Sequence, residues 1–230
     1  MIQVEGGIQM KMMNRVILYL FGLFIITIGI NLSIISDLGI SPVSAFTYPL
    51  SQATHITLGT ITFLTYTCLV LIQWLLLGKR FQLKNLLQVP FSLAFGFFVD
   101  LTGQMLSFIQ LHNYIEQFLC MILGIVICAI GATIYIVMDI VPNAPEGFNL
   151  AVSQRFQMPF SKTKILSDLM FIGIGIFISI IFIGHIVAIR EGTLISALLT
   201  GKLIGVFTKY MEPTLKSMAF SKEQFILQQE

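Results

Sequence analysis

Six long runs of apolar residues constrain the fold of this chain more than any other feature. A bilayer's hydrocarbon core is about 30 Å thick, and a helix needs about 20 apolar residues to cross it. Barrel strands would instead alternate over about ten residues. With 56% hydrophobic and only 10% charged residues, the chain carries more apolar surface than one globular core buries. The sequence therefore predicts an all-α membrane protein whose six transmembrane helices cover about residues 15–36, 57–78, 86–108, 115–140, 165–187 and 192–211.

The basic residues predict how these helices are oriented. Lys and Arg are retained on the cytoplasmic side when a membrane protein inserts. With a cytoplasmic N-terminus, all of the 13 basic residues fall inside except Arg190, which lies outside, and Lys202, which lies within the last span. The sequence therefore predicts a multi-pass protein with both termini in the cytoplasm. The sequence has no basic stripe with interleaved aromatic residues, the pattern that would indicate nucleic acid as a partner.

Two stretches of the chain resemble each other. The segment GLFIITIGINLSIISDLGISPVSAF aligns with GIVICAIGATIYIVMDIVPNAPEGF, so that an aspartate and a proline recur after a glycine-containing helix. The proline matches after one inserted residue. Further along, SLAFGFFVD and ALLTGKLIG share small residues at four-residue spacing, which is typical of close helix packing. The matched pairs are Gly22 and Gly124, Gly29 and Gly131, Asp37 and Asp139, Pro42 and Pro145, Ser92 and Ala197, Gly96 and Gly201, and Asp100 and Gly205.

The repeat predicts the domain organisation. Each copy holds three transmembrane helices, and because three is odd the second copy enters the membrane from the opposite side. We therefore expect a 3+3 inverted-topology repeat. Its parts are an N-terminal lead expected to be disordered (1–13), a first three-helix repeat (14–111), a second, inverted repeat (112–215) and a cytoplasmic tail (216–230).

The segments 42–54 and 145–157 follow the first and fourth transmembrane helices and are too short and too polar to span a bilayer. Each is a short amphipathic helix at the interface or half of a re-entrant hairpin. In the re-entrant case, the N-terminus that begins with proline would aim backbone N–H groups into the protein interior. The sequence leaves both alternatives open.

No motif indicates an enzyme, a metal or a cofactor. The chain has no G-x-S-x-G sequence, no phosphate-binding loop and no H-E-x-x-H. Cys68, Cys120 and Cys128 lie inside predicted spans without metal spacing, and the three histidines are scattered. We therefore expect a protein that is not an enzyme and that binds no cofactor or metal.

Polar residues inside or beside the spans are the candidate site residues, because ionisable groups are costly in a bilayer. Asp100 lies in the middle of the third span, and Lys202 in the sixth is its candidate counter-charge. Asp37 and Asp139 precede the two proline turns, where fixing the turn is an equally good explanation. Asp168 is explained by the electrostatics of a helix start. The remaining substrate-binding candidates are Asn31, Ser41, Ser44, Glu146 and Asn149.

Three parts of the chain match the pattern of a known family: residues 22–46 with the DLGISP turn, PEGFNLAVSQRF followed by SKTKILSD, and REGTLISALLTGKLIGVF. These segments resemble the YczE/YyaS/YitT family of bacterial integral membrane proteins. The resemblance covers most of residues 14–215. It implies a small multi-pass protein of the bacterial cytoplasmic membrane, of a family whose role is poorly defined and often guessed to be transport.

The functional hypothesis follows from the inverted repeat, which is the usual build of alternating-access carriers. We expect a small secondary transporter, a carrier or exporter, of a small polar or amphipathic solute. Its partners would be the lipid bilayer and that solute, and a homodimer is left open. The alternative is a non-transporting membrane partner or assembly protein, because a duplication can also yield a symmetric scaffold.

Overall fold

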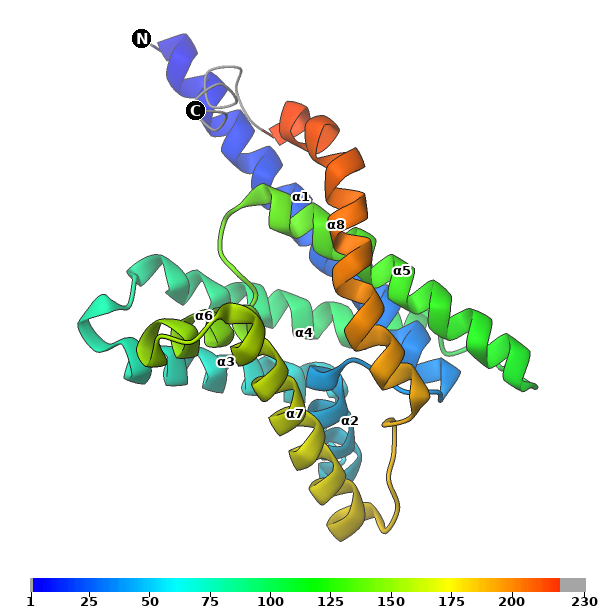
Figure 1. The fold of residues 1–230 in the computed structure, drawn as a ribbon. Helices are drawn as coiled ribbons and strands as arrows, with labels where there is room; N and C mark the ends of the chain where they lie inside the picture. Colours follow the sequence, from blue (N-terminus) through cyan, green and yellow to red (C-terminus); the bar gives the residue numbers. More distant parts are fainter. Residues whose placement is uncertain (1, 220–230) are drawn as a thin grey trace.

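The computed structural model describes residues 2–219, with side chains described from Met12 onward, and within them the fold is all-α. Residues 2–13 of the expected lead belong to the first helix, whereas residues 220–230 of the expected tail lie outside the described part. Short 3₁₀ turns η1 (Gly78–Arg80) and η2 (Leu83–Leu87) and a π-helical turn η3 (Ser179–Ile183) extend the helices. The α-helices (Figure 1) are α1 (Ile2–Ser36), α2 (Pro42–Thr54), α3 (Leu58–Leu77), α4 (Gln88–Met105), α5 (Tyr114–Met138), α6 (Ala144–Phe156), α7 (Phe160–Ile178) and α8 (Glu191–Ala219).

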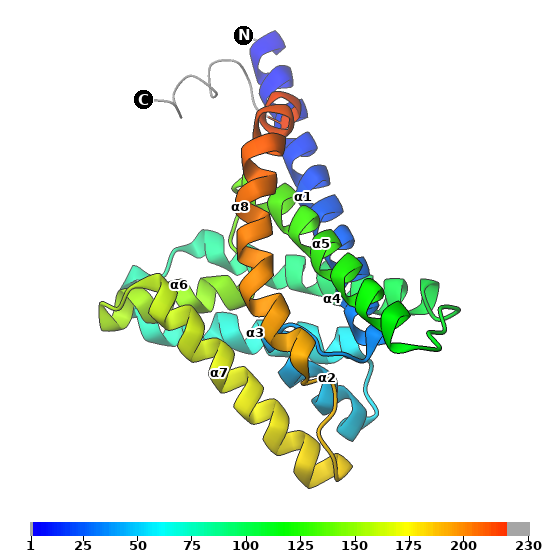
Figure 2. The same cartoon turned by 45° about the vertical axis from the view of Figure 1, so that its right-hand side comes forward.

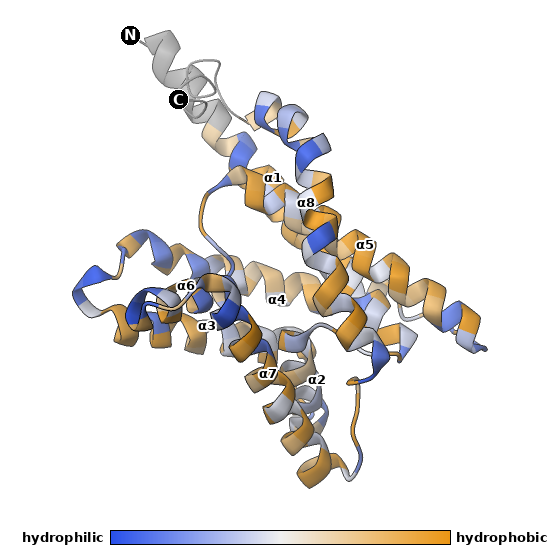
Figure 3. Ribbon diagram, in the orientation of Figure 1, coloured by the Kyte–Doolittle hydropathy of each residue, from blue (hydrophilic) through white to orange (hydrophobic). Residues whose placement is uncertain are grey.

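Six of the described helices, with the turns that extend them, are long and apolar enough to cross a membrane. This confirms the predicted number of spans. Apolar residues cover most of α5 and α7, and hydrophilic residues gather at the loop between α3 and α4 (Figure 3). The last span continues past its predicted end at residue 211 to Ala219. The candidate spans are Met12–Ser36, Leu58–Arg80, Leu83–Met105, Tyr114–Met138, Phe160–Ile183 and Glu191–Ala219.

The centre of the fold is the packing of α1 against α5, which lie side by side in both views (Figures 1 and 2). Glycines let the two backbones meet. A Cβ atom built on Gly29 would lie 2.5 Å from the Gly124 carbonyl oxygen, and one built on Gly22 would lie 2.9 Å from that of Gly131. Small residues permit such close approach between membrane helices, and dispersion contacts then hold them together. The helices are therefore antiparallel, because the earlier glycine of α1 meets the later glycine of α5.

The two short helices α2 and α6 are built alike. Each has 13 residues and a proline in its first turn. Ser41 and Asn143 are their N-caps, and each ends at a residue with positive φ, His55 or Gln157. Their starts are separated by the same 102 positions as Asp37 and Asp139. The sequence alignment inserted one residue to match Pro42 with Pro145. The structure needs no insertion, because the first residues of the two helices, Pro42 and Ala144, occupy corresponding positions.

The short helices pack on transmembrane helices of the opposite half of the chain. α2 lies along α7, and α6 lies along α3. Gly175 of α7 contacts the backbone of Ala45, whereas Gly147 of α6 contacts the side chain of Gln73, whose amide also donates to the Ala144 carbonyl at 3.2 Å. The two short helices thus lock the halves of the chain together.

α3 and α4 are closely packed, whereas α7 and α8 lie apart (Figures 1 and 2). Gly59 and Gly96 bring the backbones of α3 and α4 into direct contact. A Cβ atom built on Gly201 of α8, by contrast, would have no atom within 4 Å. The close packing expected from the small-residue spacing is therefore present at Gly96 and absent at Gly201. The molecule has one closed and one open pair of helices.

Candidate functional site

A cavity of about 410 Å³ lies between α7 and α8, with α1, α2, α5 and α6 forming most of the rest of its wall and Tyr66 of α3 and Phe95 of α4 completing it. This volume is in the range of small-molecule sites. The cavity reaches the surroundings, because Lys164 lines it and 44% of the Lys164 side chain is exposed. Most of its wall is apolar, contributed by residues such as Ile30, Ile40, Phe95 and Ile204.

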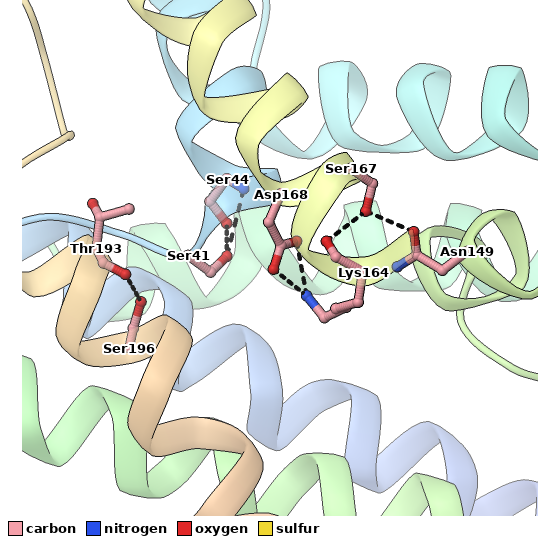
Figure 4. Close-up of polar contacts among 8 residues, drawn as sticks. All are labelled: Ser41, Ser44, Asn149, Lys164, Ser167, Asp168, Thr193 and Ser196. Atoms are coloured by element: carbon pink, nitrogen blue, oxygen red, sulfur yellow. Dashed lines mark hydrogen bonds and ion pairs between the residues drawn. The ribbon is translucent and has the colours of Figure 1, made fainter. Parts of the chain in front are cut away.

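One end of the cavity is polar (Figure 4). Lys164 and Asp168, one turn apart on α7, form an ion pair in which the ammonium lies 2.6 and 2.8 Å from the two carboxylate oxygens. Ser167 donates to the Asn149 side-chain oxygen at 2.6 Å and so joins α7 to α6. Because these groups satisfy one another, the polar end is organised before any ligand arrives.

Glu146 lies at the start of α6 and lines the same end of the cavity. Its carboxylate accepts a hydrogen bond from the Tyr135 hydroxyl of α5. Burial raises the pKa of the Glu146 carboxyl above its ordinary value, while the Tyr135 hydrogen bond and the positive charge of Lys164 partly oppose the rise. Glu146 belongs to none of the ion pairs among the described residues.

The N-termini of both short helices face the cavity. On α2 the hydroxyl oxygens of Ser41 and Ser44 lie 3.0 Å apart, and on α6 the Asn143 side chain accepts from the Ala144 N–H at 2.9 Å. Helix N-termini carry partial positive charge and stabilise nearby negative groups. The α6 terminus thereby stabilises Glu146 in its own first turn. The cavity thus combines an apolar wall with one polar end.

Four of the nine sequence-predicted site residues, Ser41, Ser44, Glu146 and Asn149, line the cavity. Asn31 does not. Its side-chain amide donates to the Val99 carbonyl at 2.9 Å and to the Thr102 hydroxyl at 2.8 Å, tying α1 to α4.

Asp100 and Lys202 are not brought together. The Asp100 carboxylate accepts from the Thr57 hydroxyl at 2.6 Å and from the Gly59 N–H at 2.7 Å, so it caps the N-terminus of α3. Lys202 is exposed and forms no ion pair with Asp100 in the described part of the chain. Asp100 thus holds α4 against α3 outside the cavity.

Asp37 and Asp139 also lie outside the cavity. Both have positive φ, 53° and 48°, and end α1 and α5 in the left-handed conformation that aspartate tolerates. An arginine donates to the backbone carbonyl of each, Arg190 to Asp37 and Arg15 to Asp139, both at 3.0 Å. The two aspartates therefore shape turns, which is one of the two explanations that the sequence left open.

The sequence analysis missed several residues of the wall. Lys164 and Asp168 were assigned to topology and to helix-start electrostatics, although their i, i+4 spacing was a signal that they form a pair. Tyr135 and Ser33 carry no distinctive sequence signal because they lie in apolar helices. Among the described residues, no three His, Cys, Asp or Glu side chains gather as a metal site would require.

The six long apolar helices of the described residues define a multi-pass integral membrane protein with a cavity of ligand size among its helices. The chain belongs to the family of unknown function DUF6198, whose model matches residues 13–209. It is similar to the uncharacterized protein YyaS of Bacillus subtilis (strain 168), with 26% identity over 195 residues that cover 84% of this chain and 92% of that protein. This confirms the family resemblance. No solved structure matches the chain.

Proposed function

We propose that the protein is a small secondary transporter, an alternating-access carrier built as a 3+3 inverted repeat, with no catalytic role. One observation carries this proposal: the cavity is lined by residues that occupy corresponding positions in the two halves. Each pair is separated by 102 positions, the spacing of the two aspartate turns. The pairs are Ile26 and Cys128, Ile30 and Ala132, Ser33 and Tyr135, Ser41 and Asn143, Val43 and Pro145, Ser44 and Glu146, and Tyr66 and Asp168.

The helix contacts support a two-fold relation between the halves. In a two-fold interface, residue i contacts residue j and j contacts i. Gly22 meets Gly131 while Gly29 meets Gly124, which is the exchanged pattern that the repeat predicts. The contacts of α2 with α7 and of α6 with α3 are exchanged in the same way. A central cavity on such an axis is where carriers with inverted repeats bind their solutes.

The difference between the halves supports alternating access. On the α3–α4 side, Tyr66 stacks on Phe95 with ring centroids 5.5 Å apart, and the two side chains are 5% and 1% exposed. Tyr66 corresponds to Asp168 by the 102-position spacing, and Phe95 corresponds to Thr200 in the alignment that matches Gly96 with Gly201. Asp168 and Thr200 line the cavity without closing it. The described conformation is therefore one of two, and the other would close α8 on α7 and separate α4 from α3.

The orientation of the carrier is part of the proposal. The open side lies toward the start of α7, next to basic residues that the topology prediction places in the cytoplasm. The Asn14 side chain donates to the Met218 carbonyl at 3.4 Å, which supports both ends of the described chain being on one side of the membrane. The described conformation would then be open to the cytoplasm.

Labelling of single cysteines tests the orientation. We expect Asn113→Cys, before α5, to react with an impermeant thiol reagent from outside, and Gln157→Cys, after α6, to react from the cytoplasmic side. The background carries alanine in place of the three native cysteines. Labelling of both positions from the same side would contradict the inversion.

The native Cys128 tests transport, because it lines the cavity. With Cys68 and Cys120 replaced by alanine, a carrier exposes Cys128 to an impermeant reagent from each side of the membrane in turn. An oxidised Ser161→Cys/Gly201→Cys pair would join α7 to α8 in the proposed conformation that closes α8 on α7. We expect it to abolish labelling from the cytoplasm and to increase labelling from outside. The reduced pair is the matched control.

A fixed scaffold would give a different result. A non-transporting assembly protein has one conformation, so Cys128 would react from one side only and the disulfide would leave the other side unlabelled. That result, together with stable co-purification of one partner protein, would contradict the carrier.

A further inference from the structure

We infer that Glu146 is an exchange site, at which a proton and the cationic head of an amphipathic solute compete. The inference rests on the proposed function and adds the class of solute and the coupling ion. In one direction of the cycle the cation occupies the carboxylate, and in the other a proton does.

The charges on the cavity wall carry the inference. In the described part of the chain the wall holds two carboxylates, Glu146 and Asp168, and one cation, Lys164. The Lys164 ammonium is bonded to both oxygens of Asp168. Glu146 has no cation of its own. The cavity therefore contains one more negative group than positive group whenever Glu146 is ionised.

The other groups that face Glu146 do not supply the missing charge. The Tyr135 hydroxyl on α5 donates a hydrogen bond to the carboxylate. Tyr19 on α1 and Tyr66 on α3 lie close enough to interact electrostatically with Glu146. All three are neutral. On α7, the positive charge of Lys164 acts on the carboxylate, but the Lys164 ammonium is hydrogen-bonded to both oxygens of Asp168 and to neither oxygen of Glu146.

An uncompensated carboxylate in an apolar cavity is costly, and it lowers that cost by taking up a positive charge. A proton does so, and the ammonium or other cationic head of a solute does so equally. The proton and the cationic head do not bind Glu146 together, because protonation removes the negative charge that attracts the cation. The exchange balances, since protonated Glu146 and the cation give the ionised Glu146–cation pair and one released proton.

The shape and polarity of the cavity define the rest of the solute. Its wall beyond the polar end is formed by branched aliphatic and aromatic side chains such as Ile30, Tyr66 and Phe95. These favour an apolar body. An anionic head would add a third negative group beside Glu146 and Asp168. The fit is therefore to an amphipathic monocation.

The experiment measures binding and proton release with the purified full chain in detergent. The probe is tetraphenylphosphonium, and tetraphenylborate is the control of the same shape and opposite charge. We expect tetraphenylphosphonium to bind and to release up to one proton in weakly buffered solution, and tetraphenylborate to do neither. Glu146→Gln should lose proton release entirely and weaken binding at least about tenfold, which equals the loss of about 1.4 kcal/mol.

The pH dependence has a defined sign. Below the pKa of Glu146 the dissociation constant of tetraphenylphosphonium should fall about tenfold per pH unit as pH rises, because the proton is the competitor. Above that pKa it should level off. The matched control is Glu116→Gln at the start of α5, outside the cavity, where glutamine also suits the capping position after Asn113. It should keep the wild-type profile.

Several outcomes would overturn the inference. They are binding of tetraphenylborate in preference, binding of tetraphenylphosphonium without proton release or unchanged in Glu146→Gln, and binding of neither probe. A loss in Glu146→Gln counts only if this variant keeps the wild-type elution volume in size-exclusion chromatography; if it does not, the proton release and pH profile of the unmodified chain decide. In each of these cases, labelling of Cys128 from both sides would still support the carrier proposal. The carrier and the exchange site are therefore tested by independent results.

Discussion

Replacing Gly29 with leucine is expected to prevent normal packing of α1 on α5 and to lower the free energy of unfolding by about 3 kcal/mol or more. A Cβ atom at this position would lie 2.5 Å from the Gly124 carbonyl oxygen and 2.7 Å from the Cys128 backbone nitrogen. Backbone atoms cannot rotate away, so the helices must separate. Size-exclusion chromatography after heating in detergent measures the loss as a lower temperature of aggregation.

Gly173→Leu is the matched control for this prediction. Gly173 is also inside an apolar helix, but a Cβ atom there has no atom within 4 Å. It gains the same helix propensity and adds the same side chain on an exposed face. We expect wild-type stability or better. Equal loss in both variants would mean that α1 and α5 do not meet at their glycines.

In the proposed carrier, Asp100→Asn is expected to shift the protein toward the conformation that is open to the outside. The carboxylate accepts two hydrogen bonds from the start of α3, whereas an amide can accept at one atom only and presents a donor at the other. Hydrogen bonds to charged groups contribute about 1.5–3 kcal/mol each. Losing one should raise labelling of Cys128 from outside at least about tenfold, measured with an impermeant thiol reagent in oriented vesicles.

Lys202 provides the control for Asp100. Because the two side chains are not paired, Lys202→Met should leave labelling unchanged, and the double variant should behave like Asp100→Asn alone. Recovery of wild-type labelling in the double variant would instead support the ion pair between Asp100 and Lys202 that the sequence suggested. Unchanged labelling in Asp100→Asn would show that the α3 cap does not hold the outer side closed.

The number and place of the transmembrane helices could be predicted from the sequence, because each span must satisfy a local requirement for about 20 apolar residues. The turns after α1 and α5 could be anticipated in part, although their left-handed backbone conformation was not predicted. Asp37 and Asp139 sit before turns, and aspartate adopts that backbone conformation at low cost. Family membership was equally accessible, since it depends on residues in order along the chain.

The sequence identified candidate site residues only in and beside the two short helices, whose length and polarity distinguish them from the spanning helices. Ser44, Glu146 and Asn149 belong to segments too polar to span the membrane, and Ser41 immediately precedes the first of these segments. The sequence therefore singled them out, while leaving open whether the segments enter the protein or lie at the interface. Tyr135 lies inside an apolar helix in which no periodicity shows which face turns inward. Lys164 and Asp168 lie in the polar first turns of α7, where topology and helix-start electrostatics already explained them. Sequence reasoning had no signal that placed these three beside Glu146.

Tertiary structure alone decided the partners of the buried polar groups and which side of the molecule is open. Asp100 meets Thr57 and Gly59, more than 40 positions away, because the backbones of α3 and α4 touch at Gly59 and Gly96. Gly201 has the same sequence spacing as Gly96 yet faces open space. Small residues permit close approach without enforcing it, so the amino-acid sequence determined where the helices can meet, and packing between helices determined which of those contacts are formed.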